Sequence, residues 1–373
     1  LDKATRGKVL HEQDVFAAVR AVHKRIRGSY AVIALIAGHG LLAFRDPYGI
    51  RPLCIGRSTA DNTVMLASES VALEGTMFQF ERDIAPGEAV FIPYGGAIQS
   101  QQCAPKHQLY PCMFEYVYLA RPDSVMDGIS VYQARLNMGE TLAKRVISNV
   151  PPDQIDAIIP IPESSRPSAM QLAQRLGIPY REGFVKNRYV GRTFIMPGQG
   201  VRKKSVRQKL NVIASEFKGR NVLLVDDSIV RGTTSREIVQ MARDAGANKV
   251  YFASAAPEVR WPNVYGIDMP TRAELLATNR DDVQIAAEIG ADAVIYQDLE
   301  ALKQAVREAS HPDALALNVF ETSCFDGHYI TGDIDEAFLA NIEARRKESM
   351  ASREESQGMV DLNLNVAEQN LVQ

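Results

Sequence analysis

Short segments of alternating apolar and polar residues characterise the first part of the chain. They are bounded by Gly, Pro and Asp, which predicts β-strands joined by turns. The expected strands cover residues 30–36, 41–44, 53–56, 63–67 and 88–92. Ahead of them, Val15, Val19, Val22 and Ile26 recur at helical spacing after Asp14, a residue type favoured at the N-cap. We therefore expect an α+β layer in which one helix covers a sheet face.

From about residue 155 the pattern changes to continuous apolar runs separated by helical segments. The runs cover residues 155–161, 178–185, 221–227, 249–255 and 293–297. Continuous apolar runs are typical of strands buried on both faces of a parallel sheet. Helical segments at 168–176 and 235–245 are each followed by glycine, a frequent helix stop, and provide crossovers between strands. This part predicts a doubly wound α/β domain.

Composition and charge narrow the class of protein. A chain of 373 residues with 46% hydrophobic and 23% charged residues is typical of a packed protein of two or three domains. A formal net charge of −3 gives no global electrostatic reason to bind nucleic acid or an anionic membrane, so any anion site must be local. The longest apolar stretch, 31–44, is interrupted by glycines and too short to span a bilayer, and residues 1–7 do not resemble a secretory signal. We expect a cytoplasmic protein.

The strongest candidate site is a strand, loop and helix between residues 221 and 235. Asp226 and Asp227 end a buried apolar strand, and ligands of open parallel sheets bind at such carboxyl ends. Gly232, Thr233, Thr234 and Ser235 lead into the helix that follows. Its first N–H groups and hydroxyls suit a phosphate, while two adjacent carboxylates suit ribose hydroxyls, directly or through Mg²⁺. The segment predicts a ribose 5-phosphate site.

Two further segments offer groups to an anionic ligand. After the run 155–161, Ser164 and Ser165 offer hydroxyl and N–H groups to a pyrophosphate or its metal. The segment 184–198 carries three cations, Lys186, Arg188 and Arg192. Two interpretations of this segment stay open, a mobile basic lid over an anionic substrate and an exposed loop with incidental charges.

These motifs resemble those of a known family. Residues 222–235 resemble the phosphoribosyl pyrophosphate (PRPP) signature of type I phosphoribosyltransferases. Further segments resemble the amidophosphoribosyltransferases, also called glutamine PRPP amidotransferases: 27–31, 46–53, 118–124, 160–163, 183–198 and 253–258. The first two of these resemble the later part of that family's N-terminal-nucleophile glutaminase domain. The resemblance extends from about residue 14 to residue 330.

The resemblance implies a domain organisation and a reaction. Residues 1–107 would be the C-terminal part of a class II glutamine amidotransferase domain, 108–310 a type I phosphoribosyltransferase domain, and 311–373 a helical extension with a polar tail. The family catalyses the first committed step of purine synthesis. Ammonia released from glutamine attacks C1 of PRPP and displaces pyrophosphate, giving 5-phosphoribosylamine.

The resemblance also implies roles for the candidate residues. Three would hold Mg²⁺: Ser164, Asp226 and Asp227. The 5-phosphate would lie at residues 232–235, and Lys186, Arg188 and Arg192 would belong to a loop that orders over PRPP. Cations suit a leaving group whose negative charge grows in the transition state. Purine nucleotides as feedback inhibitors and a homotetrameric assembly are further implications.

The sequence departs from the family at two places. The family's glutaminase nucleophile is a cysteine at the mature N-terminus, whereas residue 1 here is Leu1 and none of the four cysteines matches that position. We therefore expect a sequence that carries only part of the glutaminase domain and lacks the nucleophile. Some members hold an iron–sulfur cluster on four cysteines; Cys112 and Cys324 stand at two of these positions, but Asn263 and Glu321 stand at the others. No iron–sulfur cluster is expected.

Two other functions stay open at this point. A salvage or orotate-type phosphoribosyltransferase would share the acidic strand end, but it gives no reason for the β-rich first part. A non-catalytic PRPP-sensing regulator would keep the phosphate loop and combine it with a DNA-binding helix-turn-helix and a basic face.

Overall fold

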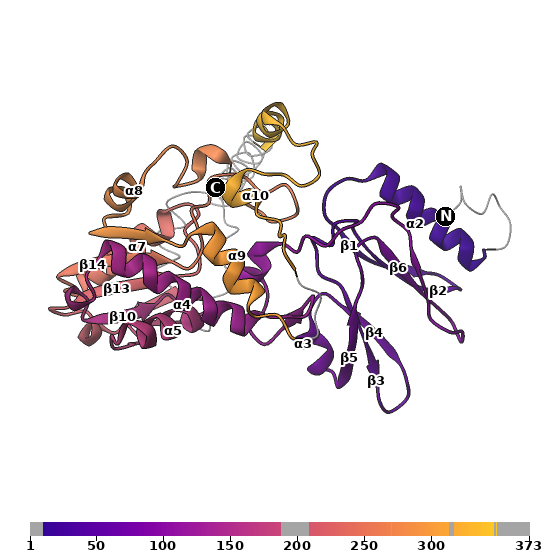
Figure 1. Cartoon of the computed structure of the whole chain (residues 1–373), viewed down its shortest axis with the longest axis horizontal. Helices are drawn as coiled ribbons and strands as arrows, with labels where there is room; N and C mark the ends of the chain where they lie inside the picture. Colours follow the sequence, from indigo (N-terminus) through magenta and orange to yellow (C-terminus); the bar gives the residue numbers. More distant parts are fainter. Residues whose placement is uncertain (1–9, 188–208, 270, 313–316, 347, 349–373) are drawn as a thin grey trace, which may run out of the picture.

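The computed structural model describes residues 10–187, 209–269, 271–312, 317–346 and 348 of the chain. Two units lie side by side along its long axis (Figure 1). The N-terminal β-unit runs from α2 (Glu12–Arg25) to β7 (Gln99–Gln102), and the parallel-sheet unit runs from β8 (Val125–Met126) to α9 (Leu299–Arg307). The expected combination of an α+β layer with an α/β domain is confirmed. No helix in the described ranges combines the length and apolar character needed to cross a membrane.

The N-terminal β-unit contains two antiparallel sheets. The first has the order β1 (Ala31–Ile36), β2 (Gly40–Arg45), β6 (Glu88–Pro93) and β7 (Gln99–Gln102). The second has the order β4 (Val64–Ala67), β3 (Cys54–Ser58) and β5 (Phe78–Asp83), with the short α3 (Ser70–Glu74) between β4 and β5. Helix α2 (Glu12–Arg25) packs Val15 and Phe16 on one face of the first sheet. On the other face, Ala43 and Val90 of the first sheet pack against Ile55 of β3 and Leu53 just before it. The central strands β2 and β6 are thus mostly buried, whereas the edge strands β1 and β7 stay partly exposed.

All five strands expected in this unit are present, with ends that shift by one or two residues. Strands β5 and β7 escaped prediction because β5 is mostly exposed or half-buried, with Phe78 and Phe80 as its only apolar residues, and β7 is made of Gln and Ser and has no apolar residue. The expected N-cap at Asp14 is wrong. Helix α2 is capped by His11, and Asp14 lies at N3, where its carboxylate accepts the backbone N–H of His11 at 3.0 Å.

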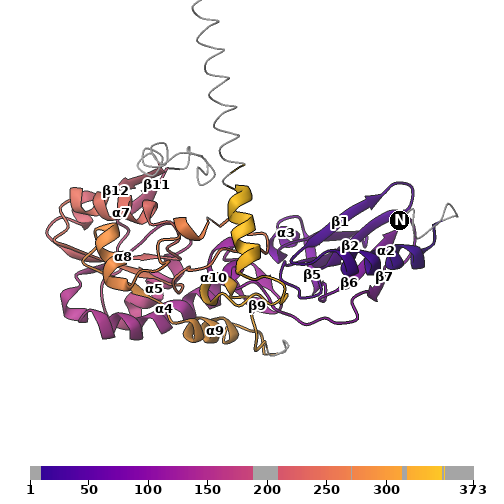
Figure 2. The same ribbon diagram turned by 90° about the horizontal axis from the view of Figure 1, so that it is seen from above.

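The parallel-sheet unit has four strands in the order β10 (Ala157–Pro160), β13 (Asn221–Asp226), β14 (Lys249–Ser254) and β15 (Ala293–Tyr296). Helices α4 (Val131–Asn149) and α5 (Arg166–Leu176) cover one face. Helices α7 (Thr233–Asp244) and α8 (Asp282–Ile289) cover the other, as the view from above in Figure 2 shows. Helix α9 (Leu299–Arg307) packs against α4. The doubly wound sheet is confirmed.

The apolar run 178–185 does not form a fifth parallel strand, and that expectation is corrected. Tyr180 makes an isolated bridge to Ile158, and the chain then enters β11 (Phe184–Lys186), which pairs antiparallel with β12 (Leu210–Val212) in a separate two-stranded ribbon. Pro179 interrupts the run, and proline has no N–H to donate to a sheet ladder.

The remaining described elements are short. They are the π-helix Glu115–Leu119, the hairpin β8 (Val125–Met126) and β9 (Ile129–Ser130), the 3-10 turns Pro152–Gln154, Ala214–Glu216 and Arg272–Glu274, α10 (Ser323–Asp326), and a helix over residues 336–346.

A buried arginine joins the two units. Arg45, at the end of β2, is only 1% exposed, and its guanidinium contacts both carboxylate oxygens of Asp127 at 2.7 and 2.8 Å. Asp83 lies beside this pair. Its burial and then the charge of Asp127 raise the pKa of Asp83 to about 7, although Arg45, Arg82 and the backbone N–H of Asp127 favour its ionised form. The junction therefore contains one carboxyl that titrates near neutrality.

Replacing Asp83 with Asn should change the pH dependence of stability. Between about pH 4 and pH 7 the folded chain keeps a proton on Asp83 that the unfolded chain, with an ordinary carboxyl pKa, has lost. The unfolded state then binds fewer protons, so Asp83 lowers stability as pH rises through this window. Asp83→Asn keeps an acceptor for the N–H of Asp127 and carries no charge. We expect its Tm to match the native Tm near pH 5 and to exceed it at pH 8.

Thermal unfolding between pH 5 and pH 8 measures this difference. Glu81→Gln is the control, because Glu81 lies on the same strand in an exposed ion pair with Arg57. Its Tm should follow the native curve. A constant offset between Asp83→Asn and the native protein at every pH would contradict the assignment.

Candidate functional site

The candidate site lies where β10 and β13 end at the same edge of the sheet. The two strands pair in parallel with Pro160 opposite Val225, so the residues that follow them emerge side by side. Asp226 ends β13 and Asp227 begins its loop, while Ser164 lies in the loop between β10 and α5. Parallel pairing thus brings together two segments that are more than 60 residues apart in the chain.

The carboxylate of Asp227 is held by two serine hydroxyls. Ser228 Oγ donates to Asp227 Oδ1 at 2.7 Å, and Ser164 Oγ donates to Asp227 Oδ2. Asp226 Oδ1 accepts the backbone N–H of Asp227 at 2.9 Å. The three residues expected to hold a metal are therefore in one cluster, with Asp227 at its centre.

Burial makes these carboxylates costly to ionise. It raises the pKa of Asp226 well above its usual range, and the neighbouring charge of Asp227 raises it further. Burial also raises the pKa of Asp227, against the opposing effects of Ser164, Ser228 and the Arg135 guanidinium. Asp227 is 7% exposed and Asp226 is half-buried, and two adjacent carboxylates in this position favour any ligand that brings hydrogen-bond donors or a cation to them.

The start of α7 forms the second half of the site. Gly232 is its N-cap with φ of 71°, a left-handed conformation that favours glycine, and a Cβ there would lie 2.8 Å from the Leu276 side chain. Helix geometry leaves the N–H groups of Thr233, Thr234 and Ser235 without acceptors inside α7. Together with the helix dipole these groups suit a phosphate.

The structure places one of the three predicted loop cations. Lys186, at the end of β11, forms an ion pair at 3.7 Å with Glu163, the residue before Ser164. Its ammonium group is therefore beside the loop of the metal candidate. Arg188 and Arg192 lie outside the described residues, as does most of the segment interpreted as a lid.

Two further residues belong to the site and were not predicted. Ser228 stands directly after the two acids, where a hydroxyl able to reach a carboxylate is a local signal. Arg135 is 2% exposed and donates to the carbonyls of Tyr116 at 2.9 Å and Ala120 at 2.8 Å. Arg135 could have been recognised in the sequence as a charged residue on the apolar face of a helix.

The oxygen donors of this cluster suit Mg²⁺ that is bound partly by water and substrate, and not a metal ion enclosed by protein ligands alone. It offers carboxylate and hydroxyl oxygens, the ligands this ion prefers. Among the described residues no group of three or more His, Cys, Asp and Glu side chains is arranged to hold a metal. Mg²⁺ usually keeps several waters and binds through one or two carboxylates and substrate phosphates, which matches an Asp pair beside a phosphate site.

The four positions that correspond to the iron–sulfur ligands of some family members lie in the core. Cys112 and Cys324 are buried in one hydrophobic cluster, and Glu321 makes a parallel bridge with Cys112. Asn263 is also buried, with its Oδ1 accepting the N–H of Tyr265 at 2.8 Å. Burial raises the pKa of both thiols.

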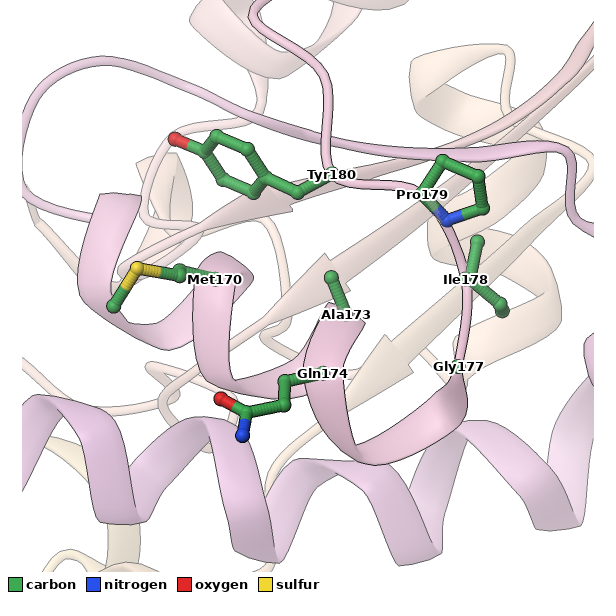
Figure 3. A pocket seen from close by; sticks show the side chains of 7 residues that line it. All are labelled: Met170, Ala173, Gln174, Gly177, Ile178, Pro179 and Tyr180. Atoms are coloured by element: carbon green, nitrogen blue, oxygen red, sulfur yellow. The ribbon is translucent and has the colours of Figure 1, made fainter.

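A shallow hollow on the α5 side of the parallel-sheet unit is separate from this cluster (Figure 3). Its lining comes from the second half of α5 and the segment after it: Met170, Ala173, Gln174, Gly177, Ile178, Pro179 and Tyr180. It contains none of the predicted site residues.

Two family models match this chain. A phosphoribosyl transferase domain matches residues 129–259, and a glutamine amidotransferase domain matches residues 6–75. The first match contains the Asp pair, Ser164 and the start of α7. The second contains α2 and the strands β1 to β4.

Curated relatives and solved structures agree with these matches. The amidophosphoribosyltransferase of Pseudomonas aeruginosa is 55% identical over 354 residues, covering 94% of this chain and 70% of the relative. That of Saccharomyces cerevisiae is 48% identical, covering 98% and 71%. The glutamine PRPP amidotransferase of B. subtilis complexed with ADP and GMP has a TM-score of 0.73 at 34% identity, covering 89% of this chain and 74% of that one.

Gly232→Ala should destabilise the chain more than Gly177→Ala. Both glycines have nearly the same φ, 71° and 68°, but a Cβ at Gly177 meets nothing within 4 Å. A left-handed alanine costs about 1 kcal/mol at either position, and overpacking against Leu276 adds about 1–3 kcal/mol at Gly232 only. Urea unfolding of both variants measures the difference. Equal losses of unfolding free energy would show that the Leu276 contact does not constrain the loop.

Proposed function

Because this chain belongs to the amidophosphoribosyltransferase family, we propose that it forms 5-phosphoribosylamine and pyrophosphate from PRPP and ammonia, which the family derives from glutamine. This is the first committed step of purine synthesis. The observation that carries the proposal is the cluster of Ser164, Asp226 and Asp227 beside the start of α7. The salvage, orotate-type and regulator alternatives are not favoured, because a glutamine amidotransferase domain and a phosphoribosyl transferase domain both match the chain.

In the proposed complex each part of PRPP meets a different part of the site. The 5-phosphate accepts N–H groups and hydroxyls from Gly232, Thr233, Thr234 and Ser235. Asp226 and Asp227 accept the ribose hydroxyls. Lys186, Arg188 and Arg192 belong to a basic lid over the substrate, where their charges offset the charge of the pyrophosphate.

The residues that would hold Mg²⁺ are Ser164, Asp226 and Asp227. When bound, this ion supplies positive charge to the pyrophosphate oxygens. Its charge would also allow both buried carboxylates to ionise, which is otherwise unfavourable. Ser164 and Ser228 orient the Asp227 carboxylate from both sides.

The reaction itself needs little acid–base catalysis. The nitrogen lone pair of ammonia forms a bond to C1, the bond from C1 to the pyrophosphate oxygen breaks with its electron pair, and the ammonium-like nitrogen then loses a proton to solvent. The protein's task is to position C1 and to stabilise the leaving group. A closed site would also keep water from competing with ammonia.

The proposal extends to domains, regulation and cofactors. We assign residues 1–107 to the glutaminase domain, 108–310 to the phosphoribosyltransferase domain and 311–373 to a helical extension. Feedback inhibition by purine nucleotides is supported by the B. subtilis relative with ADP and GMP, and a homotetramer rests on the family resemblance alone. The absence of an iron–sulfur cluster is proposed because Asn263 and Glu321 offer no thiolate beside Cys112 and Cys324.

Asp226→Asn and Asp227→Ala should each lower ammonium-dependent synthase activity. Loss of a charged hydrogen-bond acceptor costs about 1.5–3 kcal/mol, roughly 10- to 150-fold in rate, and more if the metal is lost as well. Pyrophosphate release from PRPP with ammonium measures the effect, and circular dichroism checks folding. Asp153→Asn, an exposed acid ahead of β10, is the control and should retain native activity. Full turnover in both site variants would overturn the assignment.

Ammonium should drive pyrophosphate release by this 373-residue chain, and glutamine should not. All four cysteines are buried, and burial raises the pKa of Cys54 to about 12 and the pKa of Cys103, Cys112 and Cys324 above the usual value. A glutaminase nucleophile must be an accessible thiolate, and none of these thiols is. The comparison uses PRPP with glutamine, with ammonium at high pH, and with neither. Glutamine-driven release would reveal a nucleophile among the other residues.

A further inference from the structure

A continuous path of hydrogen bonds and close contacts connects the N-terminal β-unit with the candidate site at the ends of β10 and β13. We propose that Asp127, at the start of this path, is a positioning residue. Asp127 touches Arg45 and acts on the site through α4 and α5. The proposal rests on the function proposed above, since it concerns how the PRPP site keeps its shape.

The path begins in a preorganised socket for a carboxylate. The guanidinium of Arg45 has five N–H groups, and three of them are fixed within the N-terminal β-unit by the carbonyls of Gly49 at 2.7 Å, Arg51 at 2.7 Å and Ile84 at 3.0 Å. The two remaining directions point to Asp127, whose side chain is 5% exposed. An arginine held by three carbonyls presents one fixed geometry to its carboxylate.

A tight hairpin carries Asp127 into this socket. Asp127 and Gly128 connect β8 to β9 with φ of 49° and 75°, the pattern of a two-residue type I′ turn. Met126 and Ile129 beside the tip are fully buried. The position of the Asp127 carboxylate therefore fixes the position of the hairpin.

The hairpin leads directly into α4. Ser130, its last residue, caps the helix by accepting the N–H of Gln133 at 3.3 Å. Nine residues after Ser130, α4 meets α5 at backbone distance, because a Cβ on Gly139 would lie 2.2 Å from the carbonyl oxygen of Ser168. Ser168 Oγ also donates to the carbonyl of Arg135 at 2.8 Å. A displacement of α4 is therefore transmitted to the first turn of α5.

The first turn of α5 sets the position of the metal candidate Ser164. Ser165 Oγ donates to the carbonyl of Ile161 at 2.5 Å, which closes the loop before the helix. Ser164 then reaches Asp227 across the sheet edge. Each link from Arg45 to Asp227 is a hydrogen bond, a helix cap or a backbone contact.

Loss of the Asp127 charge should therefore reduce the fraction of chains in which Ser164 and Asp227 are arranged for PRPP. A ligand that binds one arrangement has an apparent Kd raised by the reciprocal of that fraction, whereas saturating ligand restores the arrangement. KM for PRPP should rise while kcat is retained. The units stay joined in the variant, because Glu115 contacts Arg51 at 2.8 Å and Ser124 contacts Glu69 at 2.7 Å.

The first experiment measures ammonium-dependent synthesis well below the unfolding temperature. Asp127→Asn should raise the KM for PRPP about 5- to 10-fold and leave kcat within about twofold. Arg45→Lys should repeat this split, because an ammonium group cannot fill the five-donor geometry. Glu81→Gln, which removes an exposed ion pair of the same unit, should match the native enzyme. A fall in kcat with unchanged KM, or native kinetics in both junction variants, would overturn the proposal.

The second experiment uses hydrogen–deuterium exchange with and without PRPP and Mg²⁺. In the native chain the ligand should slow exchange at residues 226–235 and also in β2 and the segment 46–51. In Asp127→Asn, or in Arg45→Lys if the first variant does not fold, slowing should persist at 226–235 and disappear from β2. If PRPP slowed exchange in β2 equally in the native and variant chains, or did not slow it in the native chain, the proposed role of Asp127 would be overturned, and the proposed PRPP site would not be affected. No native slowing at 226–235 would instead contradict the proposed PRPP site.

Discussion

The burial of two adjacent carboxylates at the end of β13 is the constraint on which the site depends. Asp226 is the half-buried last residue of β13, and Asp227, the next residue, is buried. They follow the fully buried residues 222–225 of the strand, so two carboxylates lie at the edge of the core. Unpaired charges there would be expensive, and the surrounding structure responds with hydroxyls from two loops and the guanidinium of Arg135. These groups only partly offset the burial, since both pKa values stay raised. A site left in this state is suited to a ligand that brings a cation and hydroxyl donors.

The junction of the two units also buries a charged group, but there the protein satisfies all of its hydrogen bonds. Arg45 is only 1% exposed, but its five N–H groups are all used inside the protein. A satisfied guanidinium rigidifies its surroundings and has no remaining donor to offer a ligand. The contrast between Asp226 and Arg45 distinguishes a buried charge built for binding from one built for architecture. Satisfaction of hydrogen bonds, and not burial alone, separates the two roles.

The sequence predicted best where one local pattern determined the outcome. The four parallel strands and the acidic strand end were predictable because continuous apolar runs and the Asp pair are both contiguous in the chain. Strand β7 was not, since Gln99–Gln102 pairs with β6 through its backbone and leaves no side-chain pattern. The run 178–185 led to a wrong prediction of a fifth parallel strand. Its apolar residues pack at the edge of the sheet, beside Ile158, and in the two-stranded ribbon of β11 and β12. Arg135 was missed because its partners are carbonyls around 15 to 19 residues away, which no local spacing reveals.

The positions of the polar groups also indicate how the two units divide their work. Within the described ranges, the groups around Asp227 come from β13, the loops after β10 and β13, and Arg135 of α4, all in the parallel-sheet unit. The N-terminal β-unit meets that unit through Arg45, Arg51 and Glu69, which contact the segment from the π-helix to the start of α4. This segment precedes the helix that packs on α5, so it is the part of the transferase unit best placed to sense its neighbour. A chemical step at one sheet edge can then depend on a second unit that contributes no group to it.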